Sequence, residues 1–482
     1  MTHHGIEGRR RWLALTILCL GVLMIVLDTT IVNVALPSIR DDLRFSETAL
    51  VWVVNAYMLT FGGFLLLGGR LGDLYGHRRL FLAGLALFTL ASLACGLAQT
   101  REFLIAARAV QGLGGAVVSA VSLSLVMNLF TEPAERAKAM GVYGFICAGG
   151  GSLGVLLGGL LTTVLSWHWI FLVNIPIGAL VYGLCVRLIP RGRGQAMAGR
   201  LDIGGAVTIT LALMLAVYAV VNGNEAGWTS TQSVLLLTAA ALLLIAFFII
   251  EARVRAPLVP LRLFRLRNVV VANVVGVLWA GALFAWFFIS ALYLQRVLGY
   301  DAMGIGLAFL PANLIMAVLS LGLSARLVIR FGVRGPLTAG LLMAAAGLAL
   351  FSHAPSDGSF ALHVLPGMVL LGLGAGVAFN PMLLAAMSDV APSESGLASG
   401  VVNTAFMMGG SLGLAALASL AASRTSAATA AGVDVTQALN QGYQAAFMGG
   451  TLCALVAALL AGWLLRTRLT AQGEPQPGQQ MH

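Results

Sequence analysis

Two charged residues lie within long apolar stretches of this sequence. Asp28 is the only one of the 18 Asp and Glu residues deep within such a stretch, and Arg108 is the only basic residue so placed. A charge at a bilayer centre costs about 2.5–3.5 kcal/mol on insertion scales, so it should face a cavity or a partner. Burial favours a protonated carboxyl and a nearby guanidinium favours the carboxylate, so a group under both influences can exchange a proton.

This pattern predicts that Asp28 carries a proton and that Arg108 modulates it. The alternative is a permanently ionised Asp28 that only holds Arg108 in place. Asp28 lies roughly 15 Å and Arg108 roughly 8 Å below the outer ends of their segments, at 1.5 Å per residue. The long arginine side chain can cover much of that difference, directly or through a water. Gln111 lies one helical turn deeper on the same face as Arg108 and joins the predicted proton-coupling set.

The elements that position these residues must be membrane-spanning helices. Only 10% of the 482 residues are charged, 59% are hydrophobic and the mean hydropathy is +0.94, whereas soluble chains carry about 25% charged residues. Apolar runs of about 20 residues recur along the whole chain and are too long for barrel strands. Backbone groups in hydrocarbon must be satisfied internally, so each run is expected to be a helix. The predicted fold class is an all-α integral membrane protein.

Charge placement predicts the topology. Fourteen spans are expected, beginning near Trp12, Leu50, Leu80, Phe103, Ala139, Trp169, Ile203, Ser233, Asn268, Met303, Leu337, His363, Leu397 and Gly442. The loops and tails on one side hold 22 of the 28 basic residues and the other side holds five. The positive-inside rule then places both termini in the cytoplasm. The pI of about 10.0 therefore indicates topology and a weak attraction to anionic lipid, and no nucleic-acid partner is expected.

The chain also repeats itself weakly. The loop ending Gly76-His77-Arg78 resembles one 256 residues later, Gly112-Leu113-Gly114 recurs after 260 residues, and Gly150-Gly151-Ser152-Leu153-Gly154 recurs after 259. Three matches in order at nearly one offset predict a duplicated transporter, with two six-helix bundles and two inserted helices. The expected regions are a cytoplasmic N-tail (1–11), an N-terminal bundle (12–189), inserted helices with linkers (190–267), a C-terminal bundle (268–466) and a disordered cytoplasmic tail (467–482).

Several strings resemble one family. Leu27-Asp28-Thr29-Thr30-Ile31-Val32-Asn33-Val34-Ala35-Leu36-Pro37, the loop 69–79, Arg108-Ala109-Val110-Gln111-Gly112 and Trp167-His168-Trp169-Ile170-Phe171-Leu172-Val173-Asn174-Ile175-Pro176 carry the likeness. Over essentially its whole length the chain resembles the fourteen-span drug:proton antiporters of the major facilitator superfamily. The chain departs from the family pattern at Val155, where the antiporter motif has proline after a glycine.

The resemblance implies a gate in the loop after the second span. Asp73 would hold the gate of the outward-open state shut by meeting the positive N-terminal end of span 13, near Ser395 and Gly396. The alternative is a solvated loop carboxylate. The other predicted gating residues are Arg70, Gly76 and Arg78.

Two further residue sets are predicted. Small residues let helices pack closely in lipid, and the glycine stripe of span 5 is interpreted as a sliding seam between halves: Gly150, Gly151, Gly154 and Gly158. Polar and aromatic groups within spans suit an amphiphilic organic ligand, although each could equally be a core or lipid-facing residue. This substrate set is Asn33, Asn55, Tyr57, Trp279, Trp286, Asn313, Asn380 and Asn403.

The sequence thus predicts a proton-coupled exporter of amphiphilic organic compounds such as drugs, dyes or biocides. The alternatives are export of an endogenous metabolite, lipid or siderophore, and, less favoured, a membrane sensor or membrane enzyme. The chain has no nucleotide-binding G-x-x-x-x-G-K-[ST] motif and no paired cysteines or H-E-x-x-H, so neither ATP-driven transport nor a metal site is predicted. The energy source is the proton gradient, with no cofactor. The protein is expected to work as a monomer in a bacterial inner membrane, and an envelope adaptor partner stays open.

Overall fold

The computed structural model describes residues 2–130, 132–188, 202–254, 257, 261–319, 323–387, 390 and 395–465, and these are overwhelmingly helical. The helices are α1 (Thr2–Leu43), α2 (Glu47–Tyr75), α3 (His77–Gly96), α4 (Arg101–Leu129), α5 (Pro133–Val164), α6 (Trp169–Leu172), α7 (Asn174–Leu188), α8 (Ile203–Ala226), α9 (Thr231–Arg253), the 3₁₀ helix η1 (Leu261–Arg265), α10 (Arg267–Arg296), α11 (Ala302–Val318), α12 (Ser324–Phe331), α13 (Arg334–Ser352), the π-helix η3 (Phe360–Val364), α14 (Leu365–Met387), α15 (Ser395–Ala430) and α16 (Val435–Leu464). No strand occurs in these ranges.

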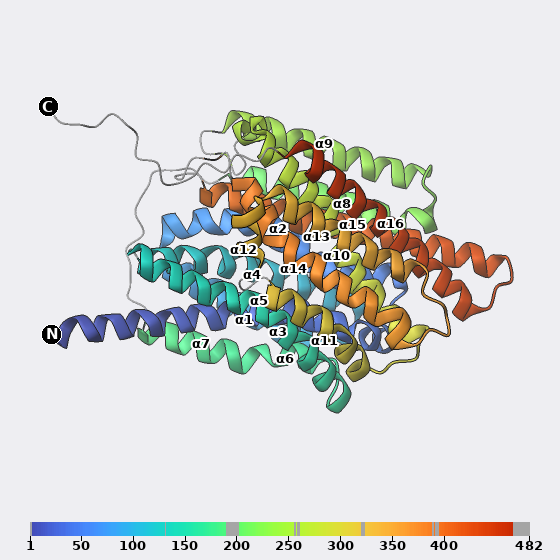
Figure 1. The fold of residues 1–482 in the computed structure, drawn as a ribbon, viewed down its shortest axis with the longest axis horizontal. Helices are drawn as coiled ribbons and strands as arrows, with labels where there is room; N and C mark the ends of the chain where they lie inside the picture. The colour runs from blue at the N-terminus through green and yellow to red at the C-terminus, as the bar shows by residue number, and fades with distance from the viewer. Residues whose placement is uncertain are drawn as a thin grey trace.

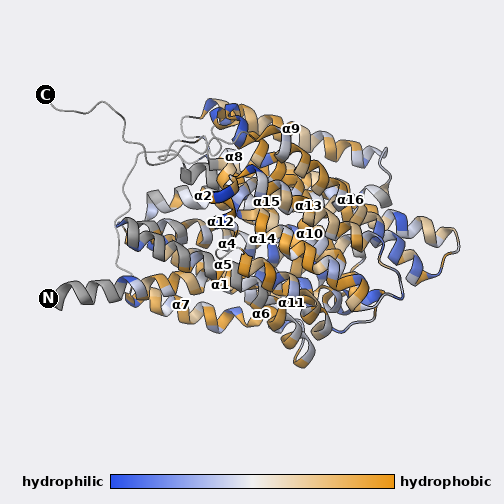
Figure 2. Ribbon diagram, in the orientation of Figure 1, coloured by the Kyte–Doolittle hydropathy of each residue, from blue (hydrophilic) through white to orange (hydrophobic). Residues whose placement is uncertain are grey.

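Twelve of these segments are long and apolar enough to cross a membrane. Hydrophobic residues run along the helices, and hydrophilic ones gather mainly toward the ends (Figure 2). Shorter apolar helices, Leu153–Val164 and Ala302–Val318, lie where the fifth and tenth spans were expected. The backbone of α5 is nevertheless one helix of 32 residues, and many side chains in its first half lie outside the described set. The count of fourteen spans therefore stays a prediction.

Local chemistry sets the helix ends. The side chains of Ser46, Thr100 and Asp301 cap α2, α4 and α11 by accepting a hydrogen bond from a backbone N–H of the first turn. Gly76 closes α2 with a φ of 93°, a left-handed conformation that favours glycine. The expected sixth span is broken at Val173, and Pro176 in the first turn of α7 has no N–H to continue the ladder from α6.

The long helices lie roughly along one direction and form two groups (Figure 1). In the first helix group (α1–α7), α1 packs on α5, and α4 packs on both α2 and α3. In the second helix group (α10–α16), α10 packs on α15 and α16, and α13 packs on α14 and α16. Each group has a close glycine contact at the corresponding place. A Cβ on Gly114 of α4 would lie 3.0 Å from the Gly84 carbonyl, and a Cβ on Gly374 of α14 would lie 2.6 Å from the Gly340 carbonyl.

The two groups meet mainly along two seams, α2 with α15 and α5 with α11, and α1 also contacts α10 and α11. At the first seam, Asn55 Nδ2 donates to the Ser411 carbonyl at 3.1 Å. At the second seam, a Cβ on Gly306 would lie 3.0 Å from the Val155 carbonyl, and a Cβ on Gly159 would lie 3.0 Å from the Ala302 carbonyl. Glycine therefore lets α5 and α11 approach backbone to backbone.

The predicted glycine stripe of α5 packs elsewhere. Cβ atoms on Gly154 and Gly158 would lie 3.0 and 2.8 Å from carbonyl oxygens of α1, and Gly150 also faces α1. Gly151 has only one neighbour, a Thr30 methyl at 3.8 Å from an added Cβ. The stripe therefore packs inside the first helix group, and the seam between the groups runs through the adjacent Gly159.

Helices α8 and α9 lie beside this bundle. Helix α8 contacts both α2 and α15, with rings of Trp52 and Tyr218 at 6.3 Å and a hydrogen bond of 3.1 Å from Ser419 Oγ to the Val220 carbonyl. Helix α9 packs mainly on α8, and many of its leucine, isoleucine and phenylalanine side chains are exposed. An exposed apolar helix face of this kind suits contact with lipid.

Candidate functional site

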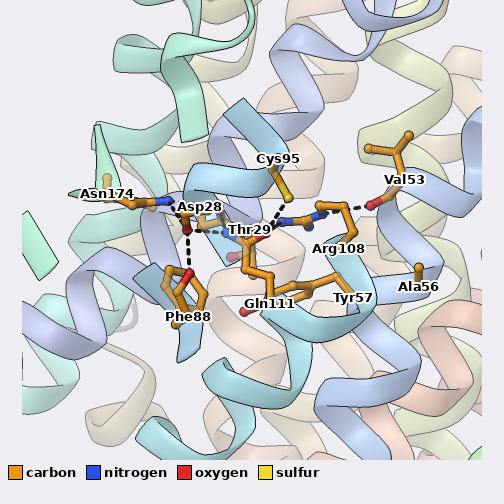
Figure 3. A network of polar contacts seen from close by, with 12 residues as sticks. Asp28, Thr29, Val53, Ala56, Tyr57, Phe88, Cys95, Arg108, Gln111 and Asn174 are labelled. Atoms are coloured by element: carbon orange, nitrogen blue, oxygen red, sulfur yellow. Dashed lines mark hydrogen bonds and ion pairs between the residues drawn. The ribbon is translucent and has the colours of Figure 1, made fainter. Parts of the chain in front are cut away.

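A closed network of polar side chains lies inside the first helix group. Asp28 comes from the middle of α1, Arg108 and Gln111 from α4, Ser92 from α3 and Asn174 from the first position of α7. All five are buried, with exposures of 1% or less. Figure 3 shows Asp28, Arg108, Gln111 and Asn174 converging from their separate helices.

The Asp28 carboxylate accepts from three donors. Arg108 Nη1 lies 2.6 Å from Oδ2, so the two predicted partners meet directly. Gln111 Nε2 donates to Oδ1 at 2.7 Å and Asn174 Nδ2 donates to the same oxygen at 3.1 Å. Charge-assisted hydrogen bonds of this kind stabilise the ionised carboxylate in a site that excludes water.

Arg108 is held from several other directions. Its Nε donates to the Val53 carbonyl at 2.9 Å and its Nη1 donates to Gln111 Oε1 at 2.6 Å. Its guanidinium carbon lies 4.3 Å from the centroid of the Tyr57 ring and 5.6 Å from that of Phe171. Aromatic faces attract a cation most strongly where water is absent, so the charge of Arg108 does not depend on Asp28 alone.

Ser92 completes the network. Its Oγ accepts from Gln111 Nε2 at 2.8 Å and from Asn174 Nδ2 at 3.3 Å, and donates to the Phe88 carbonyl at 2.9 Å. The Cys95 Sγ donates to Gln111 Oε1 at 3.7 Å. A buried polar network is stable only when its members are satisfied, and this one joins four helices through such bonds.

The site sets one buried carboxyl against a guanidinium and two amides. A buried ion pair costs more to desolvate than an apolar pair of similar volume, so it is a poor device for stability alone. The cation and the two amide donors favour the ionised carboxylate, whereas burial favours the protonated acid. Among the described residues, no group of three or more His, Cys, Asp and Glu could hold a metal ion.

Comparison with known proteins establishes the family. Residues 18–414 match the model of the Major Facilitator Superfamily. The chain belongs to this superfamily of membrane transporters. It is 41% identical to the puromycin resistance protein of Streptomyces alboniger, over 96% of this chain and 93% of the relative. It is 40% identical to the cephamycin export protein of Amycolatopsis lactamdurans, over 93% and 91% of the two chains.

Solved structures agree on the fold. The crystal structure of an autoinhibited POT family peptide transporter superposes with a TM-score of 0.67 at 17% identity, covering 97% of this chain and 99% of the other. At that identity the likeness concerns the fold alone. The chain described here is a multi-pass, helical member of the superfamily that carries a small-molecule substrate.

The predicted gating residues are described in part. Gly76 forms the turn between α2 and α3, and Arg78 Nη2 donates to the Val186 carbonyl of α7 at 2.8 Å. Arg70 and Asp73 belong to α2 and not to a loop, and their side chains lie outside the described set, as does that of Ser395 at the start of α15. The predicted contact between Asp73 and this helix terminus therefore stays a prediction.

The predicted substrate residues lie in different places. Tyr57 stacks over Arg108 within the polar network, whereas Asn55 joins α2 to α15. Asn33 Nδ2 donates to the Thr29 carbonyl of its own helix at 3.1 Å. Trp286 is buried against Phe309, with ring centroids 5.6 Å apart.

The other four predicted substrate residues also differ in burial. Trp279 and Asn313 are each 1% exposed, whereas Asn380 and Asn403 are half-buried. The eight residues therefore differ in their surroundings.

Sequence reasoning missed several members of the network. Asn174 lies within the string that carried the family resemblance, and its polar type at the start of a span was a usable signal. Ser92, Cys95 and Phe171 are ordinary residues of apolar helices, and their spacing in the chain does not relate them to Asp28. Only the packing of α3 on α4 and α7, and of α6 beside α1, brings them near it.

Proposed function

We propose that this protein is a proton-coupled exporter of amphiphilic organic compounds. The observation that carries the proposal is the buried Asp28–Arg108 pair with its amide partners. Asp28 accepts a proton from the outer side and releases it to the cytoplasm in each cycle. Arg108 returns the carboxyl to its ionised form, because a nearby guanidinium favours the carboxylate. Gln111 fixes the geometry of both groups.

The names of the relatives support the substrate class. They describe resistance to puromycin, lincomycin and methylenomycin A, export of cephamycin and, in Mycobacterium tuberculosis, multidrug resistance. We infer that this chain likewise exports an organic compound of the antibiotic kind. Aromatic residues of the second helix group suit such a ligand, as with Phe284, Phe379 and Phe406, whose ring centroids are 5.8–6.0 Å apart in two pairs.

The proposed architecture is that of the fourteen-span drug:proton antiporters. It has two six-helix halves, the first and second helix groups, with α8 and α9 inserted between them. The basic-residue bias favours a cytoplasmic location for both termini. The proposed location is the inner membrane of a bacterial cell, and the proposed functional unit is a monomer. Reporter fusions at Asn224 and Gly432 are expected to be external, and fusions at Gln195 and Gln476 internal. An internal reporter at Asn224 would remove α8 and α9 as a crossing pair.

The function is tested in proteoliposomes that hold the purified full chain and a pH-sensitive dye. Dyes, biocides and antibiotics are loaded into the lumen one at a time. Protons are expected to enter the lumen only when the loaded compound is transported out. Asp28→Asn keeps the shape of the side chain but does not exchange a proton, so it should abolish proton-driven export and retain substrate binding. Asp434→Asn is the matched control, since Asp434 caps α16 and asparagine also caps helices. Robust proton-driven export by Asp28→Asn would refute the mechanism.

A further inference from the structure

Protonation of Asp28 creates a hydrogen-bonding conflict within the network. The ionised carboxylate only accepts, whereas the acid carries one O–H that needs an acceptor. Arg108, Gln111 and Asn174 each present an N–H to the carboxyl oxygens. One of these three partners must therefore change when Asp28 takes up a proton.

Arg108 is not free to make that change. A guanidinium has five N–H donors and no acceptor. It is fastened by the Val53 carbonyl, by Gln111 Oε1 and by the rings of Tyr57 and Phe171. Because Arg108 keeps its place beside Oδ2, the proton belongs on Oδ1, where the two amides donate.

Gln111 is also fixed in one orientation. Its Oε1 accepts from Arg108 Nη1 at 2.6 Å and from Cys95 Sγ at 3.7 Å, and its Nε2 donates to both Asp28 and Ser92. A half-turn of this amide would aim its NH₂ group at the guanidinium. Two donors would then face each other in a buried site, which is costly.

Asn174 is the partner that can turn. Its bonds to Asp28 Oδ1 and Ser92 Oγ, at 3.1 and 3.3 Å, are the longest of the carboxylate–amide–hydroxyl contacts. The carboxamide oxygen and nitrogen have nearly the same size, so a half-turn exchanges Oδ1 for Nδ2 without moving α7. Ser92 would keep its bond from Gln111, and its O–H would rotate from the Phe88 carbonyl to the Asn174 oxygen that then faces it.

We propose that Asn174 is a positioning residue that follows the protonation of Asp28, donating to the carboxylate and, after a half-turn, accepting from the acid. This inference rests on the proposed proton-carrying role of Asp28. The charged and titratable groups that face Asp28 are Arg108 from α4, Tyr57 from α2 and Cys95 from α3. None of these groups is replaced in the variants that follow.

The test is the infrared difference spectrum of the full chain in lipid between acid and alkaline pH. The carboxyl C=O band of protonated Asp28 is identified by its loss in Asp28→Asn. Asn174→Leu has nearly the same volume and no hydrogen-bonding group, so it should shift that band. It should also slow proton-driven export roughly fivefold with the substrate KM little changed, as expected for one lost hydrogen bond. Asn440→Leu is the matched control, since buried Asn440 makes one bond of 3.1 Å to the Ala354 carbonyl, far from Asp28 in the chain.

A second variant keeps the test usable if Asn174→Leu does not fold. Asn174→Thr carries a hydroxyl that can donate or accept, and its band and export rate should lie nearer to the wild type than those of the leucine variant. An Asp28 band that stays unmoved in Asn174→Leu overturns the role of Asn174 alone. A wild-type protein without a titrating Asp28 band, or proton-driven export by Asp28→Asn, overturns the proton-carrying role instead.

Discussion

The two helix groups pack alike but differ in what they bury at corresponding places. The repeat aligns Arg108 and Gln111 of α4 with Met368 and Leu371 of α14, and Ser92 of α3 with Leu348 of α13. The three second-group residues are 0–1% exposed and belong to the apolar core. One group thus fills this space with hydrocarbon, and the other fills it with an ion pair and amides.

This difference separates folding from function. The second group shows that the same helix packing is satisfied by apolar side chains, which need no desolvated partners. A buried ion pair is commonly no more stable than apolar residues of the same volume. The polar network of the first group therefore adds little that the fold requires, which supports the proposed role of Asp28 as a proton carrier.

The largest expected effect comes from making the first group resemble the second. Arg108→Met leaves Asp28 buried and unpaired, so it should lower the free energy of unfolding by about 3–5 kcal/mol. Thermal unfolding in detergent measures this change, with Met368→Leu as a control of conserved volume. The double variant Asp28→Leu/Arg108→Met should regain most of the lost stability and transport nothing. A double variant as unstable as Arg108→Met would show that the network is structural.

A smaller effect is expected at the ring beneath the guanidinium. Tyr57→Leu removes a desolvated cation–π contact of 4.3 Å and should cost about 2 kcal/mol of unfolding free energy. Tyr57→Phe keeps the ring and should change stability by much less. Equal losses in both variants would assign the effect to the hydroxyl group rather than to the ring.

The two seams between the groups also differ in their contacts. The α2–α15 seam has a hydrogen bond from Asn55, whereas α5 and α11 meet at glycines. Asn55→Leu removes the bond from Nδ2 to the Ser411 carbonyl on the α2–α15 seam, which should weaken that contact by about 1 kcal/mol. Cysteine accessibility on the two membrane faces should change by roughly fivefold, since 1 kcal/mol corresponds to that factor. Asn33→Leu is the comparison, because Asn33 bonds only its own helix among the described contacts. Unchanged accessibility in Asn55→Leu would show that the bond does not influence the conformational equilibrium.

The smallest effect is expected at Asp73, in the last turn of α2. Asp73→Asn should shift the resting conformation toward the inward-open state by about 0.3–1 kcal/mol, the usual value for a charge at a helix terminus. Ile329 stands at the corresponding place in the second group and is 79% exposed, so Ile329→Asn is the control. Wild-type flux and accessibility in Asp73→Asn would leave Asp73 as a solvated residue at the end of α2.

Part of the site could be predicted because an isolated charge within an apolar stretch can be recognised in the amino-acid sequence. Asp28 and Arg108 stood out by their burial cost alone, and the length of each span made their contact plausible. Ser92 and Cys95 gave no such signal, since small polar residues are common in membrane helices. Tyr57 was assigned to the substrate because its type fits a ligand wall, but the packing of α2 on α4 places its ring on Arg108.

The amino-acid sequence by itself determined that the chain is a bundle of membrane helices, that its two parts are related, and that one buried ion pair belongs to the first part. These properties depend on hydropathy, periodicity and charge, which act along the chain. Only the tertiary structure decided that Asn174, directly after the break between α6 and α7, donates to Asp28. It also decided that Gly159, rather than the Gly150–Gly158 stripe, meets the second group. The physical reason is that such contacts depend on which helix faces meet, and residues far apart in sequence become neighbours only after the helices have packed.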